Sequence, residues 1–181
     1  MKKRNKAIAL MMSLMLIVGA VVGGTVAYLI TNTDPLVNTF TAGDINITLT
    51  ESKNLDLKMV PGKVIAKDPK VTVLKDSEAC WLFVKIEKTN NVDTFLTYAV
   101  ADGWTALTDV NGVYYREVAA TTADTSFSVL ANDQVTVLTT VTKNQLTALT
   151  DSTYPKLSFT AYAIQKEGFA TASAAWTEIN K

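Results

Sequence analysis

The sequence of 181 residues lacks histidine altogether and contains one cysteine, Cys80. The absence of histidine excludes Ser-His-Asp and Cys-His catalysis, the HExxH zinc motif and every other His-based metal site. A single cysteine forms neither an intramolecular disulfide nor a thiolate zinc site. The sequence also has no Walker loop and no GxGxxG motif. We therefore expect no enzyme activity, no cofactor and no metal site.

Two short arrangements have both a chemical and a plain interpretation. Lys156 and Ser158 share one face of a predicted strand, where they form either a Ser-Lys dyad or, as we favour, part of a solvated surface. Asp109 and Asn111 lack the further acidic residues and the closing Glu of a calcium loop. A tight turn is therefore favoured at that position.

Acidic and basic residues balance at 17 each, but the basic ones are unevenly placed. Lys2, Lys3, Arg4 and Lys6 all precede the first acidic residue. The rest of the chain holds 13 basic and 17 acidic residues, which is a net charge of −4. Such a chain lacks the clustered Lys and Arg that phosphate contacts need, so we expect no nucleic-acid partner. Anionic lipid surfaces should repel it as well.

Residues 7–22 form an almost unbroken apolar run directly after the basic cluster. The run is shorter than the roughly 20 residues of a membrane span, and its basic flank is typical of a signal peptide. Thr25 and Ala27 supply the small side chains that a peptidase needs for a cut between Ala27 and Tyr28. We expect the chain to contact the membrane only before this cut and then to be secreted. An uncleaved anchor extending through Ile30 is the alternative.

The segment 28–40 differs from the apolar run before it and from the strands after it. Pro35 excludes a central strand position and favours extended geometry in the residue before it. Apolar side chains are more numerous here than a purely solvated tail needs, and they are Leu29, Ile30, Leu36, Val37 and Phe40. The segment is either a disordered terminus or, as we favour, an extended arm whose strand awaits a partner.

From residue 41 onward the chain consists of short runs with a two-residue alternation of apolar and polar side chains. The predicted strands include residues 44–50, 71–74, 80–88, 113–118, 126–130, 134–142 and 157–164. Roughly eight strands with short loops predict an all-β domain, an antiparallel two-sheet sandwich of jelly-roll type. The expected organisation is a signal peptide (1–27), an extended N-terminal arm (28–40) and a β-sandwich domain (41–181).

Several local features refine this expectation. Asn111-Gly112 predicts a type I′ hairpin turn, and Pro61-Gly62 predicts a turn ahead of a strand. Residues 90–107 are irregular, which indicates a loop with a short helix and a strand around Trp104. The Ala-rich tail predicts one or two helical turns that dock Trp176. Cys80 belongs to the apolar face of its strand, so we expect a buried, unreactive thiol.

Four segments resemble a known family: residues 23–29 (GGTVAYL), 38–49 (NTFTAGDINITL), 59–62 (MVPG) and 159–165 (FTAYAIQ). They are similar to segments of the TasA/camelysin family, which comprises Gram-positive proteins whose signal peptides are removed by the dedicated peptidase SipW. The similarity is good over the first 65 residues and around residues 157–176, and weak between them.

The resemblance implies a jelly-roll domain secreted to the cell surface or to the biofilm matrix. Some members of the family polymerise into fibres, in which the freed N-terminal strand is inserted into the sheet of the next subunit. Carried over to this chain, the donor is the arm, SipW is the peptidase partner and the product is a homopolymer. The camelysin branch is described as a metalloprotease, but the absence of histidine gives no basis for carrying that activity over.

Two function classes therefore stand at this point. The first is a structural matrix protein that self-assembles through its N-terminal arm. The second is a monomeric secreted β-sandwich that binds or adheres through its loops, for example around Trp104 and Tyr114-Tyr115. A camelysin-like protease is a weaker third alternative.

Overall fold

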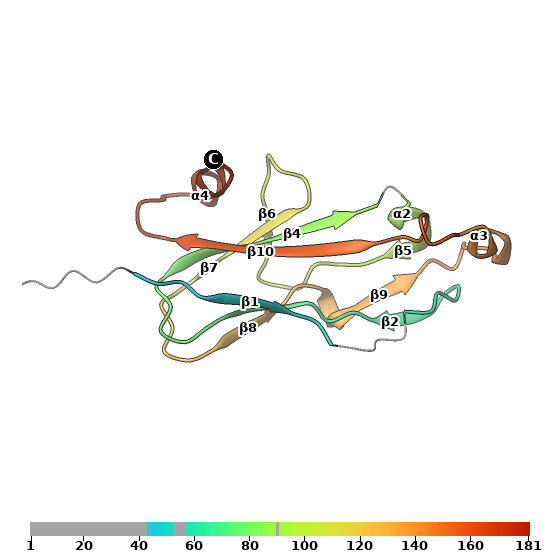
Figure 1. Ribbon diagram of the computed structural model, residues 1–181, viewed down its shortest axis with the longest axis horizontal. Helices are drawn as coiled ribbons and strands as arrows, with labels where there is room; N and C mark the ends of the chain where they lie inside the picture. The colour runs from blue at the N-terminus through green and yellow to red at the C-terminus, as the bar shows by residue number, and fades with distance from the viewer. Residues whose placement is uncertain (1–42, 53–56, 90) are drawn as a thin grey trace, which may run out of the picture. The chain divides into compact units, whose positions relative to one another are not determined.

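The computed structural model describes residues 43–52, 57–89 and 91–181 (Figure 1). The predicted cleavage site and assembly arm lie outside the described residues, and they are Ala27, Tyr28, Leu29, Ile30, Leu36, Val37 and Phe40. The signal peptide, the arm and the predicted domain boundaries therefore remain predictions. The strands expected after residue 43 can be compared directly.

The described part of the chain is mostly β-structure, as the alternating pattern predicts. It contains the strands β1 (Ile47–Thr50), β2 (Val64–Ala66), β3 (Lys70–Val73), β4 (Cys80–Lys88), β5 (Leu96–Thr97), β6 (Thr105–Ala106), β7 (Val113–Val118), β8 (Thr125–Ser128), β9 (Gln134–Val137) and β10 (Leu157–Gln165). The helical segments are α2 (Val92–Phe95), the 3-10 turn η1 (Ala131–Asp133), α3 (Lys143–Thr147) and α4 (Ala172–Ile179). Within the same residues, no helix has the length and apolar character needed to cross a membrane.

The strands form three antiparallel sheets, with the orders β1-β3-β8, β10-β4-β7-β6 and β2-β9-β5. The all-β prediction is confirmed, and the arrangement is consistent with a sandwich. The layer expected opposite the β10-β4-β7-β6 sheet, however, is divided into two short sheets, β1-β3-β8 and β2-β9-β5. Pro69, which has no N–H to donate, separates β2 from β3, and the left-handed Asn132 and Asp133 separate β8 from β9. Hydrogen bonds from Val129 to the Pro69 carbonyl (2.9 Å) and from Lys67 to the Asp133 carbonyl (2.8 Å) span these breaks.

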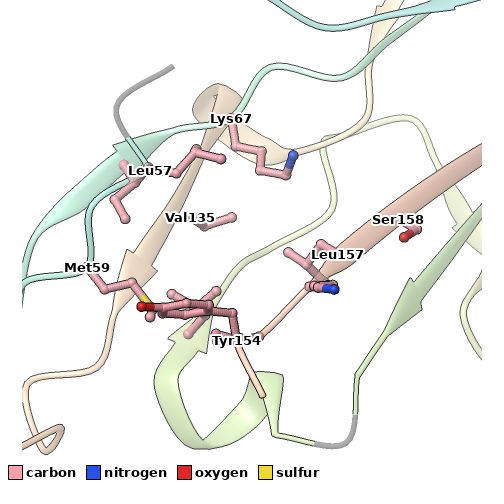
Figure 2. A pocket seen from close by; sticks show the side chains of 11 residues that line it. Leu57, Met59, Lys67, Val135, Tyr154, Leu157 and Ser158 are labelled. Carbon is pink, nitrogen blue, oxygen red and sulfur yellow. The ribbon is translucent and has the colours of Figure 1, made fainter. Parts of the chain in front are cut away.

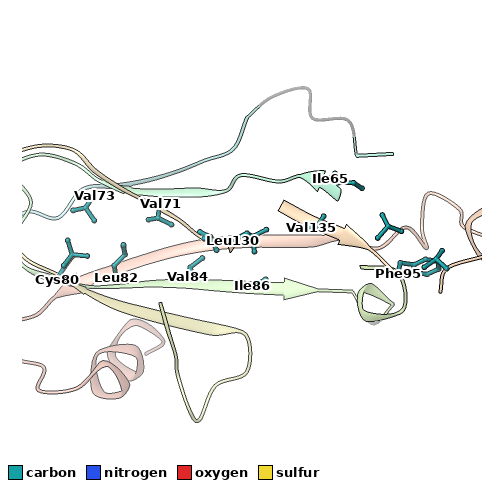
Figure 3. Close-up of a cluster of buried hydrophobic side chains, with 14 residues drawn as sticks. Ile65, Val71, Val73, Cys80, Leu82, Val84, Ile86, Phe95, Leu130 and Val135 are labelled. Atoms are coloured by element: carbon teal, nitrogen blue, oxygen red, sulfur yellow. The ribbon is translucent and has the colours of Figure 1, made fainter. Parts of the chain in front are cut away.

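β4 has the bounds that the sequence predicts, and both of its faces are used. Cys80, Leu82, Val84 and Ile86 point into the main core, toward Val71 and Val73 of β3 (Figure 3). β10 pairs with β4 along its whole length, from Leu157 opposite Lys88 to Gln165 opposite Cys80. Because both strands are nine residues long, this pair is the longest ladder among the described residues.

A second, smaller core lies on the outer face of the β10-β4-β7-β6 sheet. There Trp176 of α4 packs on Phe83 and Tyr162, with ring centroids 5.2 and 5.3 Å apart. The Trp176 side chain is 8% exposed, so the predicted docking of the tail is confirmed. Thr171 caps α4 by accepting a hydrogen bond from the Ala174 N–H.

The two predicted turns are both present, but one has a different type. At Pro61-Gly62, the Lys63 N–H donates to the Val60 carbonyl at 2.9 Å and Gly62 has φ +78°. The β6–β7 hairpin also forms, yet only Gly112 of the Asn111-Gly112 pair has positive φ, at +77°. The predicted type I′ turn is therefore wrong, because that type requires positive φ at both central residues.

The irregular region contains the elements that its composition suggested. α2 is a short helix that buries Val92 and Phe95, and β6 directly follows Trp104. The Trp104 indole N–H donates to the Ser128 carbonyl at 2.9 Å. This bond attaches the loop before β6 to the end of β8.

Candidate functional site

Among the described residues, six strands lie at the edges of the three sheets, and β1, β2 and β10 are three of them. Within the described part of the chain, β1 pairs with β3 alone, β2 with β9 alone and β10 with β4 alone. An unpaired edge exposes a row of backbone N–H and C=O groups that another strand can complete. β10 is the longest of the three, so it offers the most pairing positions.

An open apolar groove lies between the start of β10 and the β2-β9-β5 sheet (Figure 2). Its volume is about 440 Å³. The lining residues come from four parts of the chain, and they are Leu57, Met59, Ile65, Lys67, Leu96, Val135, Tyr154, Pro155, Lys156, Leu157 and Ser158. Figure 2 shows Tyr154 beside Met59 at one end of the groove. Leu157 lies across the groove from Met59, with Val135 between them. The groove is an apolar site that adjoins the start of the edge strand β10.

Among the described residues, five large apolar side chains are exposed, and two of them line the groove. They are Leu49, Leu57, Val60, Val64 and Tyr154. Leu57 and Tyr154 line the groove and are 53% and 44% exposed. Scattered single residues of this kind are normal, but two of them at one apolar groove are typical of an interaction surface.

Lys67 lies at the groove with its charge already compensated. Its Nζ contacts the Glu51 carboxylate at 2.7 Å and lies 5.3 Å from the centre of the Phe159 ring. Only 13% of the Lys67 side chain is exposed. This pair therefore contributes little net charge to the groove, and Lys156 is the other charged residue of the lining.

The alternative chemical interpretations find little support in the geometry. Lys156 and Ser158 both line the groove, but no hydrogen bond joins them in the part of the chain that the structure describes. Residues 43–52, 57–89 and 91–181 contain no group of three or more His, Cys, Asp or Glu side chains that could hold a metal ion. Asp109 belongs to the β6–β7 turn, as the favoured interpretation expects.

Cys80 is fully buried in the main core, which confirms its predicted position. Desolvation raises the pKa of the thiol from 9.0 to about 11. Because the thiolate is the reactive form, this environment keeps the side chain unreactive at neutral pH.

The three aromatic residues proposed for a loop site lie in three different surroundings. Trp104 contacts Arg116, whose guanidinium also lies 3.7 Å from the centre of the Phe127 ring. Tyr115 packs edge-on against Trp81 at 5.9 Å, so it belongs to the second core. Tyr114 lies on the opposite face of β7 and borders a separate polar depression. The structure therefore does not gather these residues into one site.

Sequence reasoning missed the groove itself. Leu57 was visible as an apolar residue in a polar segment, and Tyr154 as the residue before Pro155. Neither signal indicated that residues almost a hundred positions apart would line one surface. In the structure, Leu157 belongs to the β4–β10 ladder and lines the groove together with residues of the β2-β9-β5 sheet.

Comparisons of the chain with protein-family models, with characterised proteins and with solved structures found no match. The class that the fold and the groove define is an all-β protein with an open apolar groove beside the edge strand β10. The function of this protein is therefore argued from its own residues.

Proposed function

We propose that this protein is a secreted structural protein of the cell surface or biofilm matrix. After removal of the signal peptide between Ala27 and Tyr28 by SipW, residues 28–40 form a strand that is donated to the next subunit. The domain is a sandwich of jelly-roll type. The resemblance to the TasA/camelysin family motivates this proposal, and the apolar groove beside β10 is the observation that carries it.

The groove has the properties that an acceptor for a donated strand needs. Among the residues that the structure describes, the outer edge of β10 pairs with no other strand, and the adjoining apolar lining can hold alternate side chains of an added strand. Leu36, Val37 and Phe40 of the arm supply apolar side chains of matching character. Burying each such side chain stabilises the contact by roughly 1.5–3 kcal/mol. Pro35 lacks an N–H, so the inserted part starts after it or places it at an edge.

The geometry of such an exchange determines the type of assembly. The donor is at the N-terminus and the acceptor is in the domain, so each contact joins two different surfaces. Heterologous contacts of this kind produce open chains unless the rotation between subunits closes a ring. Filaments are the expected product.

The strand order supports the jelly-roll assignment. β4 lies between β10 and β7, and β3 lies between β1 and β8, so spatial neighbours are distant in sequence. Connections that cross between the layers in this way are typical of Greek-key sandwiches and jelly rolls.

Deletion of the arm tests the proposal directly. The protein starting at Tyr28 should form filaments that are visible by electron microscopy, and light scattering should rise with its concentration. The same protein without residues 28–40 should keep its circular-dichroism spectrum and stay monomeric. If the truncated protein still forms filaments, the donated strand is not the cause. A monomer at all concentrations for both proteins would instead support the binding or adhesion class.

A further inference from the structure

A polar surface on the β5 side of the domain has no role in the proposed assembly. Two depressions of about 380 and 240 Å³ lie there, and Thr97 and Tyr98 line both. The larger one is completed by Lys88, Asp93, Leu96, Tyr114 and Leu138. The smaller one is completed by Ala99, Ala131, Asn132, Gln134 and Thr136. Because they share two lining residues, the depressions form adjacent subsites on either side of Tyr98.

The side chains at this surface retain unused hydrogen-bonding capacity. In the described part of the chain, no side-chain hydrogen bond involves Thr97, Tyr98, Tyr114, Asn132 or Gln134. Together they present hydroxyl groups, which both donate and accept hydrogen bonds, and amide groups, which donate through nitrogen and accept through oxygen. A ligand with many hydroxyl groups would find partners along both subsites.

The two tyrosine rings are held in place from behind. Tyr98 and Tyr114 pack against the main core while remaining partly exposed. Burial raises the pKa of Tyr98 further above neutral pH, where the phenol of a tyrosine is protonated in any case and can donate. A ring fixed in this way offers an apolar face and a polar tip at little entropic cost.

The charges at this surface cancel. The Lys88 Nζ contacts the Asp93 carboxylate at 2.5 Å, and the lining of the smaller depression contains no charged residue. A phosphate, a sulfate or an acidic polymer would therefore find no unpaired cation among the lining residues. The mainly polar lining of the larger depression likewise disfavours an acyl chain or the apolar anchors of a peptide there.

We propose that the two depressions flanking Tyr98 form a binding site for a neutral oligosaccharide, with one sugar unit in each. A sugar ring combines an apolar C–H face, which suits a tyrosine ring, with hydroxyl groups that suit Thr97, Asn132 and Gln134. The site adds a function to the protein beyond assembly. It shares only Leu96 with the apolar groove, so its test does not depend on filament formation.

The test uses the purified protein that starts at Tyr28, titrated with maltotetraose, cellotetraose and chitotetraose in saturation-transfer NMR. At least one of these neutral probes should bind with saturation, while polygalacturonate should not compete. Tyr98→Ala should lower the affinity at least about tenfold, which corresponds to the loss of one well-packed aromatic contact. Tyr154→Ala, at an exposed tyrosine in the apolar groove, is the matched control and should bind like the wild type.

A second variant protects the test against a folding defect. Thr97→Val keeps the shape of an exposed side chain and removes its hydroxyl group, so the domain should remain folded while affinity falls several-fold. The proposal is overturned if none of the three tetrasaccharides binds at millimolar concentration. It is equally overturned if Thr97→Val and a folded Tyr98→Ala both bind as tightly as the wild type.

Discussion

Gly112 lies directly against the backbone of Ile86. The Ile86 N–H donates to the Gly112 carbonyl at 2.8 Å, and a Cβ atom added to Gly112 would lie 2.6 Å from the Ile86 carbonyl oxygen. Gly112 also has φ +77°, a backbone conformation that side chains with a Cβ disfavour. The turn between β6 and β7 is therefore held against β4 by a contact that only glycine permits.

Replacing Gly112 with alanine should destabilise the domain. Alanine would have to hold a left-handed backbone conformation, which costs roughly 1–3 kcal/mol. Its Cβ would also clash with a backbone atom that cannot move aside. Gly168→Ala is the matched control, since Gly168 has φ +89° but no heavy atom within 4 Å of the added Cβ. Urea unfolding should give a clearly lower midpoint for Gly112→Ala than for Gly168→Ala. Equal midpoints would show that the contact with Ile86 contributes nothing.

The strands with strong alternation could be predicted from the sequence because their pattern follows from burial on a pleated sheet. From Cys80 to Ile86 every second residue is apolar, as on the buried face of a strand, and the structure gives β4 the predicted bounds. The docking of Trp176 was predictable too, because a large aromatic residue in a short Ala-rich helix has to find an apolar surface. Phe83 and Tyr162 provide it.

The division of the second layer and the groove could not be predicted in this way. Asn132 and Asp133 adopt left-handed backbone conformations that their residue types permit but do not require. Leu57 and Tyr154 line one groove although they lie far apart in the sequence, and the pairing of β10 with β4 fixes where the segment after Tyr154 lies. Long-range pairing of this kind leaves no periodic signal in either segment.

The burial of Cys80 makes a prediction about alkaline pH. The pKa of the thiol is raised from 9.0 to about 11 in the folded protein by desolvation, so the folded state keeps a proton that the unfolded state loses above pH 9. The stabilising effect is complete below pH 9 and is lost as the pH rises toward 11. The stability advantage of the wild type over Cys80→Ala, measured by urea unfolding, should therefore shrink between pH 9 and 11. A constant difference across this range would contradict the assigned environment.

The predicted cut between Ala27 and Tyr28 depends on the small side chain of Ala27, the residue directly before it. Ala27→Trp should block processing, because the peptidase accepts only small side chains there. Mass spectrometry of the secreted wild type should give Tyr28 as the N-terminal residue. The variant should remain in the membrane fraction with its full length and should form no filaments. Ala20→Trp, inside the apolar run, is the control and should be processed normally.

The acceptor role of the groove can be distinguished from nonspecific hydrophobic association through other exposed apolar residues. Leu57 and Val60 are both exposed apolar residues of the segment before β2, at 53% and 45%, but only Leu57 lines the groove. Leu57→Asp places a charge where the donated strand would bury an apolar side chain, so filament mass in a sedimentation assay should fall at least about tenfold. Val60→Asp should assemble like the wild type. If both variants lose filaments equally, or neither does, the groove is not the acceptor.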